Sequence, residues 1–418
     1  MSQTRQYDVA IIGGGVIGLA LALHLLDAGR SVLVLEQGGV GSGASHGNCG
    51  TITPSHALPL SLPGMIGQAL RWMAARDAPF YVQPRLDFEL LSWLLGFARR
   101  CNWETARRVG RARAELLTHS RLWLAELIAR EQIACEFVES GLLTVFGSQQ
   151  AFDRSRYLER ELPAIGIAIE AWTPAQVQAA EPALKPGLVA GHWYPGDARL
   201  RPDRFVVALA ERVRGRGGEI REQARVDRFQ QAGDGLAAVV AGQTIVASQI
   251  VLCAGSWSPG LTRALGLRIP LQPGKGYSIT YSRPGLCPTL PLVLREPSVC
   301  VTSWGSGYRL GSTMEFAGFD ASLNRVRLDA LVRGARRFLI EPEGPARIEE
   351  WGGWRPMSVD ELPIIGASSR FANLHYATGH GMLGVSMAVA TGRLLAAALC
   401  GRVPELDLGP YAPRRFGL

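Results

Sequence analysis

The first long apolar segment of the chain runs from Val9 to Leu26 and carries one histidine but no charged residue. The stretch "YDVAII", which begins at Tyr7 and leads into this segment, is an apolar and β-branched run that predicts a buried strand. The segment "VIGLALALHLLDAG" predicts a helix that ends at Gly29. The glycines between them would weaken a membrane-spanning helix, and no convincing small-residue cleavage site of a signal peptide follows. We therefore predict a strand, a turn and a helix.

Further along the chain, apolar positions indicate helices between residues 63 and 131, interrupted by "DAPFYVQPRLD". These Trp-, Leu- and Arg-rich helices are interpreted either as an amphipathic layer over a core or as an interfacial patch that docks on anionic lipid. A strand is expected over 140–146, and a helix is expected from Pro202 to Gly217. Strands ending at Ala254 and Gly255 suggest a late return to the first sheet.

The turn of the first segment carries the pattern G-x-G-x-x-G at Gly13, Gly15 and Gly18. The first glycine permits a tight turn, the second lets the backbone approach a pyrophosphate, and the third lets helix and strand pack closely. A second strand, "SVLVLE", ends at Glu36, at the spacing of an acid that accepts hydrogen bonds from a ribose 2′-OH. The order of these elements predicts a dinucleotide site, and Glu36 disfavours NADP.

A long glycine-rich loop, "GGVGSGASHGNCGTITPSHALPL", follows Glu36. It is interpreted either as a flexible surface loop or as a cofactor-lining segment, with Ser42, Ser45, His46 and Asn48 as the candidates.

Composition excludes some classes of protein. All but two of the 44 basic residues are arginines spread along the chain, so the net charge of +8 does not indicate a nucleic-acid partner. The seven cysteines are odd in number and far apart, which predicts no disulfide framework and no metal site, and favours a reducing compartment. Cys49 is the cysteine whose reactivity we would examine.

Two late segments add the remaining chemistry. "WGGWRPMSVDELPIIG" places Arg355 among apolar neighbours, where its charge requires an anionic partner, either a protein carboxylate or a ligand. "YATGHGMLGVSMAVATG" predicts a strand end, a glycine turn and a helix, and so a second helix N-terminus with free N–H donors. A flavin uses such donors, because its reduced ring carries negative charge.

Together these motifs resemble the FAD-dependent D-amino-acid oxidase superfamily, which includes glycine oxidase, sarcosine oxidase and bacterial D-amino-acid dehydrogenases. The resemblance lies in "AIIGGGVIGLALALHLLDAGRSVLVLE", "GASHGNCG", "IVLCAGSWSPGL", "PGKGYSIT", "LGSTMEFAGFD", "WRPMSVDELPIIG" and "ATGHGMLGVSMAVATG". The chain is most similar to bacterial D-amino-acid dehydrogenases, and within them to enzymes acting on D-proline and cis-4-hydroxy-D-proline.

The resemblance implies an α/β fold in which a Rossmann-like FAD-binding domain is interleaved with an α+β substrate domain that contains a mainly antiparallel sheet. We expect the FAD domain at about residues 1–85, 196–262 and 352–418. The substrate domain is expected at about residues 86–195 and 263–351.

The resemblance also implies a reaction and its residues. A hydride would pass from the substrate α-carbon to flavin N5, giving an imine or a pyrroline carboxylate. Arg355 would bind the substrate carboxylate, with Tyr277 and His380 as further substrate-side candidates. The expected cofactor-binding residues are Gly13, Gly15, Val16, Ile17, Gly18, Glu36, Gln37, Ser42, Ser45, His46, Asn48, Cys49, Gly50, Val226, Ala254, Gly255, Gly381, Met382, Leu383 and Gly384.

Two departures from the family pattern matter. No cysteine lies near Gly353, where sarcosine oxidases attach flavin covalently, so noncovalent FAD is expected. No tyrosine lies between Leu294 and Cys300, where glycine oxidases carry the second carboxylate-binding residue.

The expected partners are a D-amino acid and a respiratory electron acceptor, either a quinone or an electron-transfer partner. We expect a cytoplasmic protein, and peripheral contact with the inner face of the cell membrane is a further hypothesis. The alternatives that stay open are an O2-using glycine- or sarcosine-oxidase-like enzyme, an FAD module acting on modified tRNA, and a flavin-binding sensor without catalysis.

Overall fold

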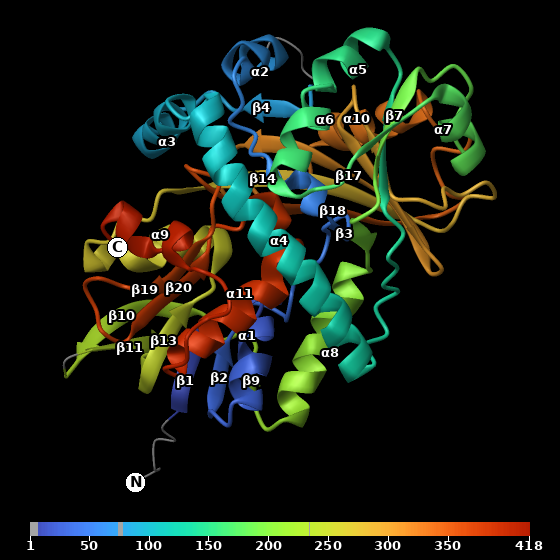
Figure 1. Ribbon diagram of the computed structural model, residues 1–418. Helices are drawn as coiled ribbons and strands as arrows, with labels where there is room; N and C mark the ends of the chain where they lie inside the picture. Colours follow the sequence, from blue (N-terminus) through green and yellow to red (C-terminus); the bar gives the residue numbers. More distant parts are fainter. Residues whose placement is uncertain (1–6, 74–77, 234) are drawn as a thin grey trace.

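The first sheet of the molecule contains the strand predicted at the start of the chain. The computed structural model describes residues 7–73, 78–233 and 235–418. Within these residues six strands form this sheet, all neighbours parallel except the edge strand β19 (Figure 1). In order across the sheet they are β19 (Ile364–Ala367), β20 (Leu374–Thr378), β13 (Ala247–Leu252), β1 (Tyr7–Ile12), β2 (Val32–Leu35) and β9 (Glu219–Arg221).

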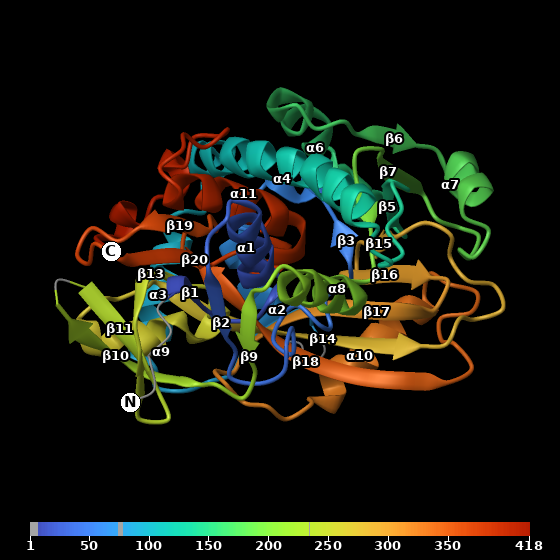
Figure 2. The ribbon, with the colours of Figure 1, turned by 90° about the horizontal axis from the view of Figure 1, so that it is seen from below.

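Both faces of the first sheet are covered, which explains why its strands are apolar runs. Along β1, Val9 and Ile11 pack on one side, and Ala10 and Ile12 pack on the other. The first side carries four helices: α1 (Val16–Asp27), α4 (Trp103–Glu131), α8 (Pro202–Gly215) and α11 (Gly384–Leu399). The second side carries a small sheet of β10 (Val226–Ala232), β11 (Gly235–Val240) and β12 (Gln243–Ile245) (Figure 2).

Helix α11 lies directly against α1. A Cβ added to Gly392 would come within 2.7 to 2.9 Å of the backbone at Ala20 and Leu21, so a glycine is needed for this close approach. Among the described residues, one helical stretch, Gly381–Leu399, is long and apolar enough to cross a membrane. Since two thirds of its most apolar window is buried inside the molecule, its apolarity serves the core.

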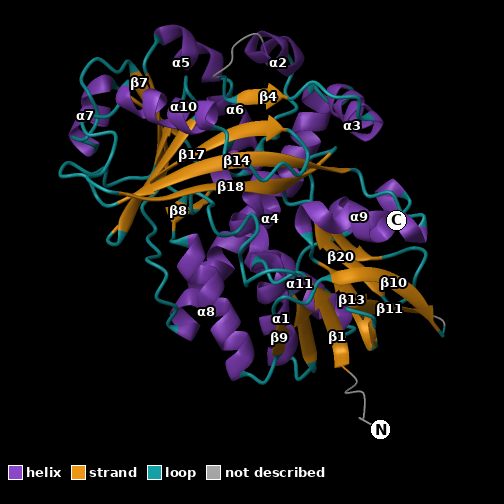
Figure 3. Ribbon diagram, turned by 180° about the vertical axis from the view of Figure 1, so that it is seen from behind, coloured by secondary structure: helices purple, strands orange, loops and turns teal. Residues whose placement is uncertain are grey.

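The second layer is a large, mainly antiparallel sheet (Figure 3). Its main path runs through β18 (Arg347–Ser358), β14 (Leu271–Tyr281), β17 (Gly307–Phe316), β16 (Val299–Trp304), β15 (Leu292–Leu294), β5 (Leu142–Phe146), β7 (Ala190–Tyr194) and β6 (Glu170–Trp172). Strand β4 (Phe80–Val82) pairs with β17, and helix α10 (Arg325–Arg336) packs on the face that carries Tyr277 and Ile279.

Shorter elements complete the described chain. Helices α2 (Met65–Met73) and α3 (Phe88–Ala98) lie beside β4 at the top of Figure 1, within the region where helices were predicted. The remaining elements are β3 (Thr51–Ile52), α5 (Gln149–Ser155), α6 (Leu158–Glu161), α7 (Pro174–Ala180), β8 (Ala198–Arg199) and α9 (Ser258–Thr262).

The predicted fold class is confirmed by the parallel first sheet and the mainly antiparallel large sheet. The domain boundaries stay a prediction, and residues 1–6 and 74–77 of the first range lie outside the described residues. Two strands do not respect these boundaries. β18 runs continuously across residues 351 and 352, because it pairs with β14 along its whole length from Arg347 to Ser358, and β4 joins the large sheet although it precedes residue 86.

Candidate cofactor and substrate site

One long cavity of about 770 Å³ extends from the first sheet to the large sheet. This volume is typical of a cofactor and ligand site. Most of the predicted site residues line it. They are Gly13, Gly15, Val16, Ile17, Glu36, Gln37, Ser42, Ser45, Asn48, Cys49, Val226, Ala254, Gly255, Arg355, His380, Gly381, Met382, Leu383 and Gly384.

The part of the cavity beside β1 and β2, which we call the dinucleotide end, is built from backbone. Gly13 has φ of +117°, and a Cβ there would lie 2.5 Å from the carbonyl oxygen of Cys253. Helix α1 begins after Gly15 with no acidic residue in its first turn and no side-chain cap of its own. Ser45 Oγ, from the following loop, accepts a hydrogen bond from Val16 N at 3.1 Å. Such a helix N-terminus attracts a diphosphate.

Glu36 closes the dinucleotide end. Its Oε2 accepts a hydrogen bond from Gly14 N at 2.7 Å, and its Oε1 accepts one from Gly38 N at 2.8 Å. These bonds orient the carboxylate, and each oxygen keeps a second lone pair for a ribose hydroxyl. Gln37 and Val226 line the cavity beside it.

A second set of backbone donors begins helix α11. A short turn, Gly381–Leu383, precedes the helix, and neither it nor the helix start has a side-chain cap. His380 lies just before this turn, with Nε2 3.0 Å from Thr391 Oγ1. Burial lowers the pKa of His380 to about 3, so this imidazole is neutral at ordinary pH.

The other part of the cavity, which we call the large-sheet end, contains Arg355. This residue lies on β18 with its guanidinium over Gly276, where a Cβ would be only 2.3 Å away. Its Nη1 donates a hydrogen bond to the carbonyl oxygen of Thr313 at 2.6 Å. Thr313 has φ of +60° at an irregularity in β17, a strained conformation of the kind found at functional sites.

No carboxylate pairs with Arg355 among the described residues. Burial lowers the pKa of Arg355, yet an arginine stays protonated because its ordinary pKa lies above 12. A partly buried guanidinium without a carboxylate partner favours an anionic ligand. Of the two alternatives for this arginine, the described part of the chain therefore does not support the structural ion pair with a protein carboxylate.

Sequence reasoning missed several residues of the large-sheet end. Arg295, Ser298 and Cys300, from the β15–β16 hairpin, line the cavity beside Cys49. The sequence showed only that this stretch has no tyrosine. The alternation of side chains along β16 was the available signal, but it becomes useful only when the register of the hairpin is known.

Tyr277 does not reach the cavity. Successive side chains of a strand face opposite sides of the sheet, and Gly276 faces Arg355, so Tyr277 faces α10. Its hydroxyl donates a hydrogen bond to Glu315, and only 1% of the residue is exposed. The structure therefore supports core packing for Tyr277, and its predicted place on the substrate side is wrong.

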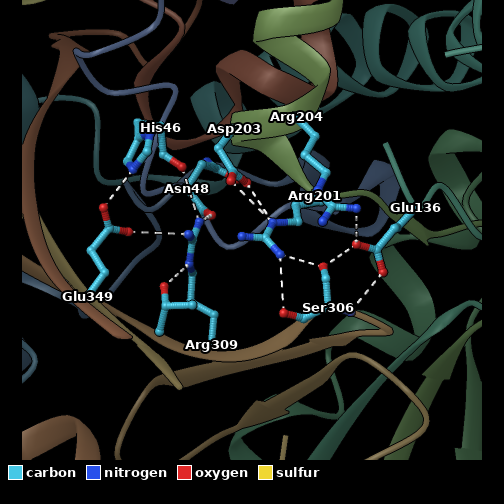
Figure 4. Close-up of polar contacts among 10 residues, drawn as sticks. His46, Asn48, Glu136, Arg201, Asp203, Arg204, Ser306, Arg309 and Glu349 are labelled. Carbon is cyan, nitrogen blue, oxygen red and sulfur yellow. Dashed lines mark hydrogen bonds and ion pairs between the residues drawn. The ribbon is translucent and has the colours of Figure 1, made fainter. Parts of the chain in front are cut away.

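Three predicted cofactor residues also lie outside the cavity lining. A Cβ on Gly18 would lie 2.1 Å from the carbonyl oxygen of Gly13, so Gly18 packs helix against turn. Gly50 has φ of +74° and lies against the carbonyl oxygen of Leu200. His46 turns away, with its Nε2 2.7 Å from Glu349 Oε1, and this contact raises the pKa of His46 (Figure 4).

The loop that carries His46 and Asn48 is held to the large sheet by Arg309, which is 1% exposed. Arg309 Nη1 donates hydrogen bonds to the carbonyl oxygens of His46 and Asn48, at 3.1 and 2.7 Å, and its Nη2 lies 3.6 Å from Glu349 Oε2 (Figure 4). The segment 46–48 is therefore held in place, and its residues Gly47 and Asn48 form an ordered part of the cavity wall, as the cofactor-lining interpretation of the loop requires.

The donor set suits FAD. The dinucleotide end offers the N-terminus of α1, where no acidic side chain competes, for a diphosphate and a carboxylate for a ribose. The turn Gly381–Leu383 offers backbone N–H groups where the pyrimidine part of the ring would develop negative charge. Gly13, Val16, Glu36 and Met382 would be among the residues that hold the cofactor.

Comparison with known proteins agrees with this geometry. A model of the family described as FAD dependent oxidoreductase matches residues 8–398. A protein named D-amino acid dehydrogenase from Methylobacterium radiotolerans is 35% identical over 417 residues, covering 97% of this chain and 99% of the relative. One of the same name from Granulibacter bethesdensis is 31% identical and covers 98% and 99%.

Solved structures show the same fold. Glycine oxidase from Geobacillus kaustophilus superposes with a TM-score of 0.77 at 23% identity, covering 98% of both chains. L-proline dehydrogenase from P. horikoshii gives 0.74 at 16% identity, covering 99% of this chain and 98% of the other. The predicted resemblance, the FAD cofactor and the oxidoreductase class are thereby confirmed. The chain belongs to the FAD dependent oxidoreductase family.

Proposed function

We propose that this protein is a D-amino-acid dehydrogenase that prefers a cyclic secondary amine, such as cis-4-hydroxy-D-proline or D-proline. The observation that carries this proposal is Arg355, a guanidinium in the cavity wall without a carboxylate partner among the described residues. Relatives at 31 to 35% identity that are named D-amino acid dehydrogenase support the reaction class. The cyclic amine rests on the motif resemblance, and the FAD is expected to be noncovalent.

The protein's own residues would bind the substrate and orient it. The planar guanidinium of Arg355 can hold a carboxylate through two parallel hydrogen bonds, which fixes the direction of the Cα–H bond. The neutral His380 adds no second positive charge beside the turn. When bound, FAD supplies the acceptor for the hydride. Orientation by Arg355 and exclusion of water by the cavity walls would be the main contributions of the protein.

A substrate panel tests this proposal. Under anaerobic conditions the purified holoenzyme is mixed with D-proline, cis-4-hydroxy-D-proline, D-alanine, glycine and sarcosine, and the visible absorption band of the flavin is followed. Bleaching by the two cyclic substrates supports the proposal. Bleaching by glycine or sarcosine alone would contradict it, and release of hydrogen peroxide in air that matches substrate turnover would favour an oxidase.

We also propose that electrons leave to a respiratory acceptor at an anionic membrane surface, on the inner face of the cell membrane. Helix α2 buries none of its side chains, and large apolar side chains are exposed on it and around α3. These residues are Ile66, Leu70, Met73, Leu86, Phe88, Leu91 and Leu95. Arg71 and Arg99 are exposed on the same two helices, and their charge suits anionic lipid.

Sedimentation with vesicles tests the membrane proposal. The holoenzyme should pellet with anionic vesicles at low salt and remain in solution with neutral vesicles. Leu70→Glu with Phe88→Glu should abolish pelleting, whereas Val403→Glu, at a residue that is 92% exposed outside these helices, should leave it unchanged. A holoenzyme that stays in the supernatant with anionic vesicles would refute the proposal.

A further inference from the structure

Two cysteines meet in the wall of the cavity. Cys49 comes from the loop after Glu36, and Cys300 comes from β16, 251 positions later, yet the two side chains lie close enough to interact. Both residues line the cavity, and all seven cysteines of the chain are free thiols. Cys253, which follows β13 of the first sheet, also lines the cavity, whereas the other four cysteines do not.

The sheet explains why these thiols meet. Gly311 lies directly opposite Cys300 in the β16–β17 pairing, and side chains opposite each other share a face. A Cβ on Gly311 would lie 2.5 Å from Cys49 Sγ, so Cys49 occupies the space that the glycine leaves open. The thiol of Cys49 is thereby placed over the same face as Cys300.

The surroundings distinguish the two thiols chemically. Arg355 and Arg309 are the charged groups that act on Cys49, and both favour its thiolate. The interaction with Cys300, together with these arginines, lowers the pKa of Cys49, whereas the pKa of Cys300 is raised by the same interaction and by burial. The pair therefore consists of one nucleophilic sulfur and one sulfur that keeps its proton.

We propose that Cys49 and Cys300 form an oxidisable dithiol site within the substrate cavity, which a small hydroperoxide converts into an intramolecular disulfide. Their contact over Gly311 and their shared exposure to the cavity carry this inference. The site is distinct in chemistry from Arg355, which it borders.

The reaction balances with hydrogen peroxide as the oxidant. The Cys49 thiolate attacks one peroxide oxygen, so an S–O bond forms, the O–O bond breaks, and hydroxide leaves and takes up a proton. The sulfur of Cys300 then attacks the Cys49 sulfenic acid, the S–O bond breaks, and water leaves with the Cys300 proton. One peroxide is reduced to two waters, and two thiols are oxidised to one disulfide.

The disulfide would change the site in a defined way. The Cys49 sulfur would be bonded to Cys300 on β16, and it could no longer ionise next to Arg355. Any effect of this change on turnover rests on the proposed function. Formation of the bond does not, because peptide mass and thiol content are measured without a substrate.

The test treats the holoenzyme with a small excess of hydrogen peroxide and then maps its peptides under nonreducing conditions. We expect the loss of two titratable thiols per chain and a cross-linked peptide pair joining Cys49 to Cys300, both reversed by dithiothreitol. Free thiols at both positions, or oxidation confined to other cysteines, would overturn the proposal.

Variants distinguish disulfide formation by the pair from oxidation of either thiol alone. Cys300→Ser should leave Cys49 as a sulfenic acid that dimedone traps, and Gly311→Ala should reduce cross-linking because its methyl group displaces the Cys49 sulfur. Cys101→Ser is the matched control, since Cys101 lies outside the cavity and burial raises its pKa to about 11. Equal cross-linking in wild type and Gly311→Ala would contradict the geometry.

Discussion

The two ends of the cavity are built in different ways. At the dinucleotide end, backbone N–H groups and glycines within one strand–turn–helix unit form the surface, and Glu36 follows on the adjacent strand. At the large-sheet end, side chains from β16, β18 and the loop after Glu36 meet from distant parts of the sequence. The first end is a local backbone structure, whereas the second depends on strand register and on buried charge.

This difference predicts different effects of substitutions at the two ends of the cavity. Changing a glycine at the dinucleotide end should remove the cofactor and weaken the fold together, because the backbone itself is the binding surface. Changing a side chain at the large-sheet end should lower substrate binding or turnover and leave the cofactor bound.

Gly13→Ala should have the largest effect. Its Cβ would lie 2.5 Å from the carbonyl oxygen of Cys253, and its φ of +117° strains any residue with a side chain. We expect a loss of about 2–5 kcal/mol of folding free energy and loss of bound flavin, measured by thermal denaturation and by the flavin-to-protein absorbance ratio. Gly29→Ala is the control, with positive φ but no atom near its Cβ, and should cost only about 1 kcal/mol. Full flavin content in Gly13→Ala would contradict the view that the backbone at the dinucleotide end is the cofactor-binding surface.

Arg355→Lys should keep flavin and lose turnover. The lysine retains the charge but not the planar pair of donors, so kcat/KM should fall about 100-fold, or about 2.7 kcal/mol. Steady-state kinetics with an artificial electron acceptor measures this effect. Arg347→Lys, at an exposed ion pair on the same strand, should match the wild type. An unchanged kcat/KM in Arg355→Lys would show that Arg355 does not bind the substrate carboxylate.

Tyr277→Phe distinguishes the two faces of the large sheet. The change removes the hydrogen bond to Glu315, which is 5% exposed and keeps a contact from Asn324 Nδ2 at 3.2 Å. Stability should fall by about 1–2 kcal/mol without a change in kcat/KM, as urea denaturation and kinetics would show. A lower kcat/KM with unchanged stability would indicate that Tyr277 acts at the substrate site.

His46→Gln should have the smallest effect, and it should depend on pH. Glu349 raises the pKa of His46, so the stabilisation is complete below the unfolded value of about 6.5 and is lost as pH rises through the raised folded value. At the acid end it is lost as Glu349, whose pKa is lowered, becomes protonated. Because the pair is partly exposed, the difference between wild type and variant should be about 0.5 kcal/mol. Urea denaturation at pH 6 and pH 9 tests it, and equal differences at both pH values would contradict the assignment.

The comparison also explains what could be predicted from sequence. Gly13, Gly15 and Glu36 line the cavity, as their local spacing led us to expect, because that spacing determines their geometry. Tyr277 was misplaced because neighbouring strand residues face opposite sides, and the parity of β14 depends on its long-range partners. Cys300 and Arg295 were not chosen because their access to the cavity depends on the β15–β16 hairpin. Arg355 was found through its apolar surroundings and the family resemblance.

The position of Arg309 has a mechanical consequence. It belongs to the large sheet, but its hydrogen bonds end on the carbonyl oxygens of His46 and Asn48, in a loop that begins at the first sheet. A parallel link joins Arg201, just before α8, to Ser306 beside β17 (Figure 4). A hinge rotation of one sheet relative to the other would have to break both links at once. We therefore expect the two sheets to move as one rigid body, so that ligand exchange depends on local motion of the cavity walls.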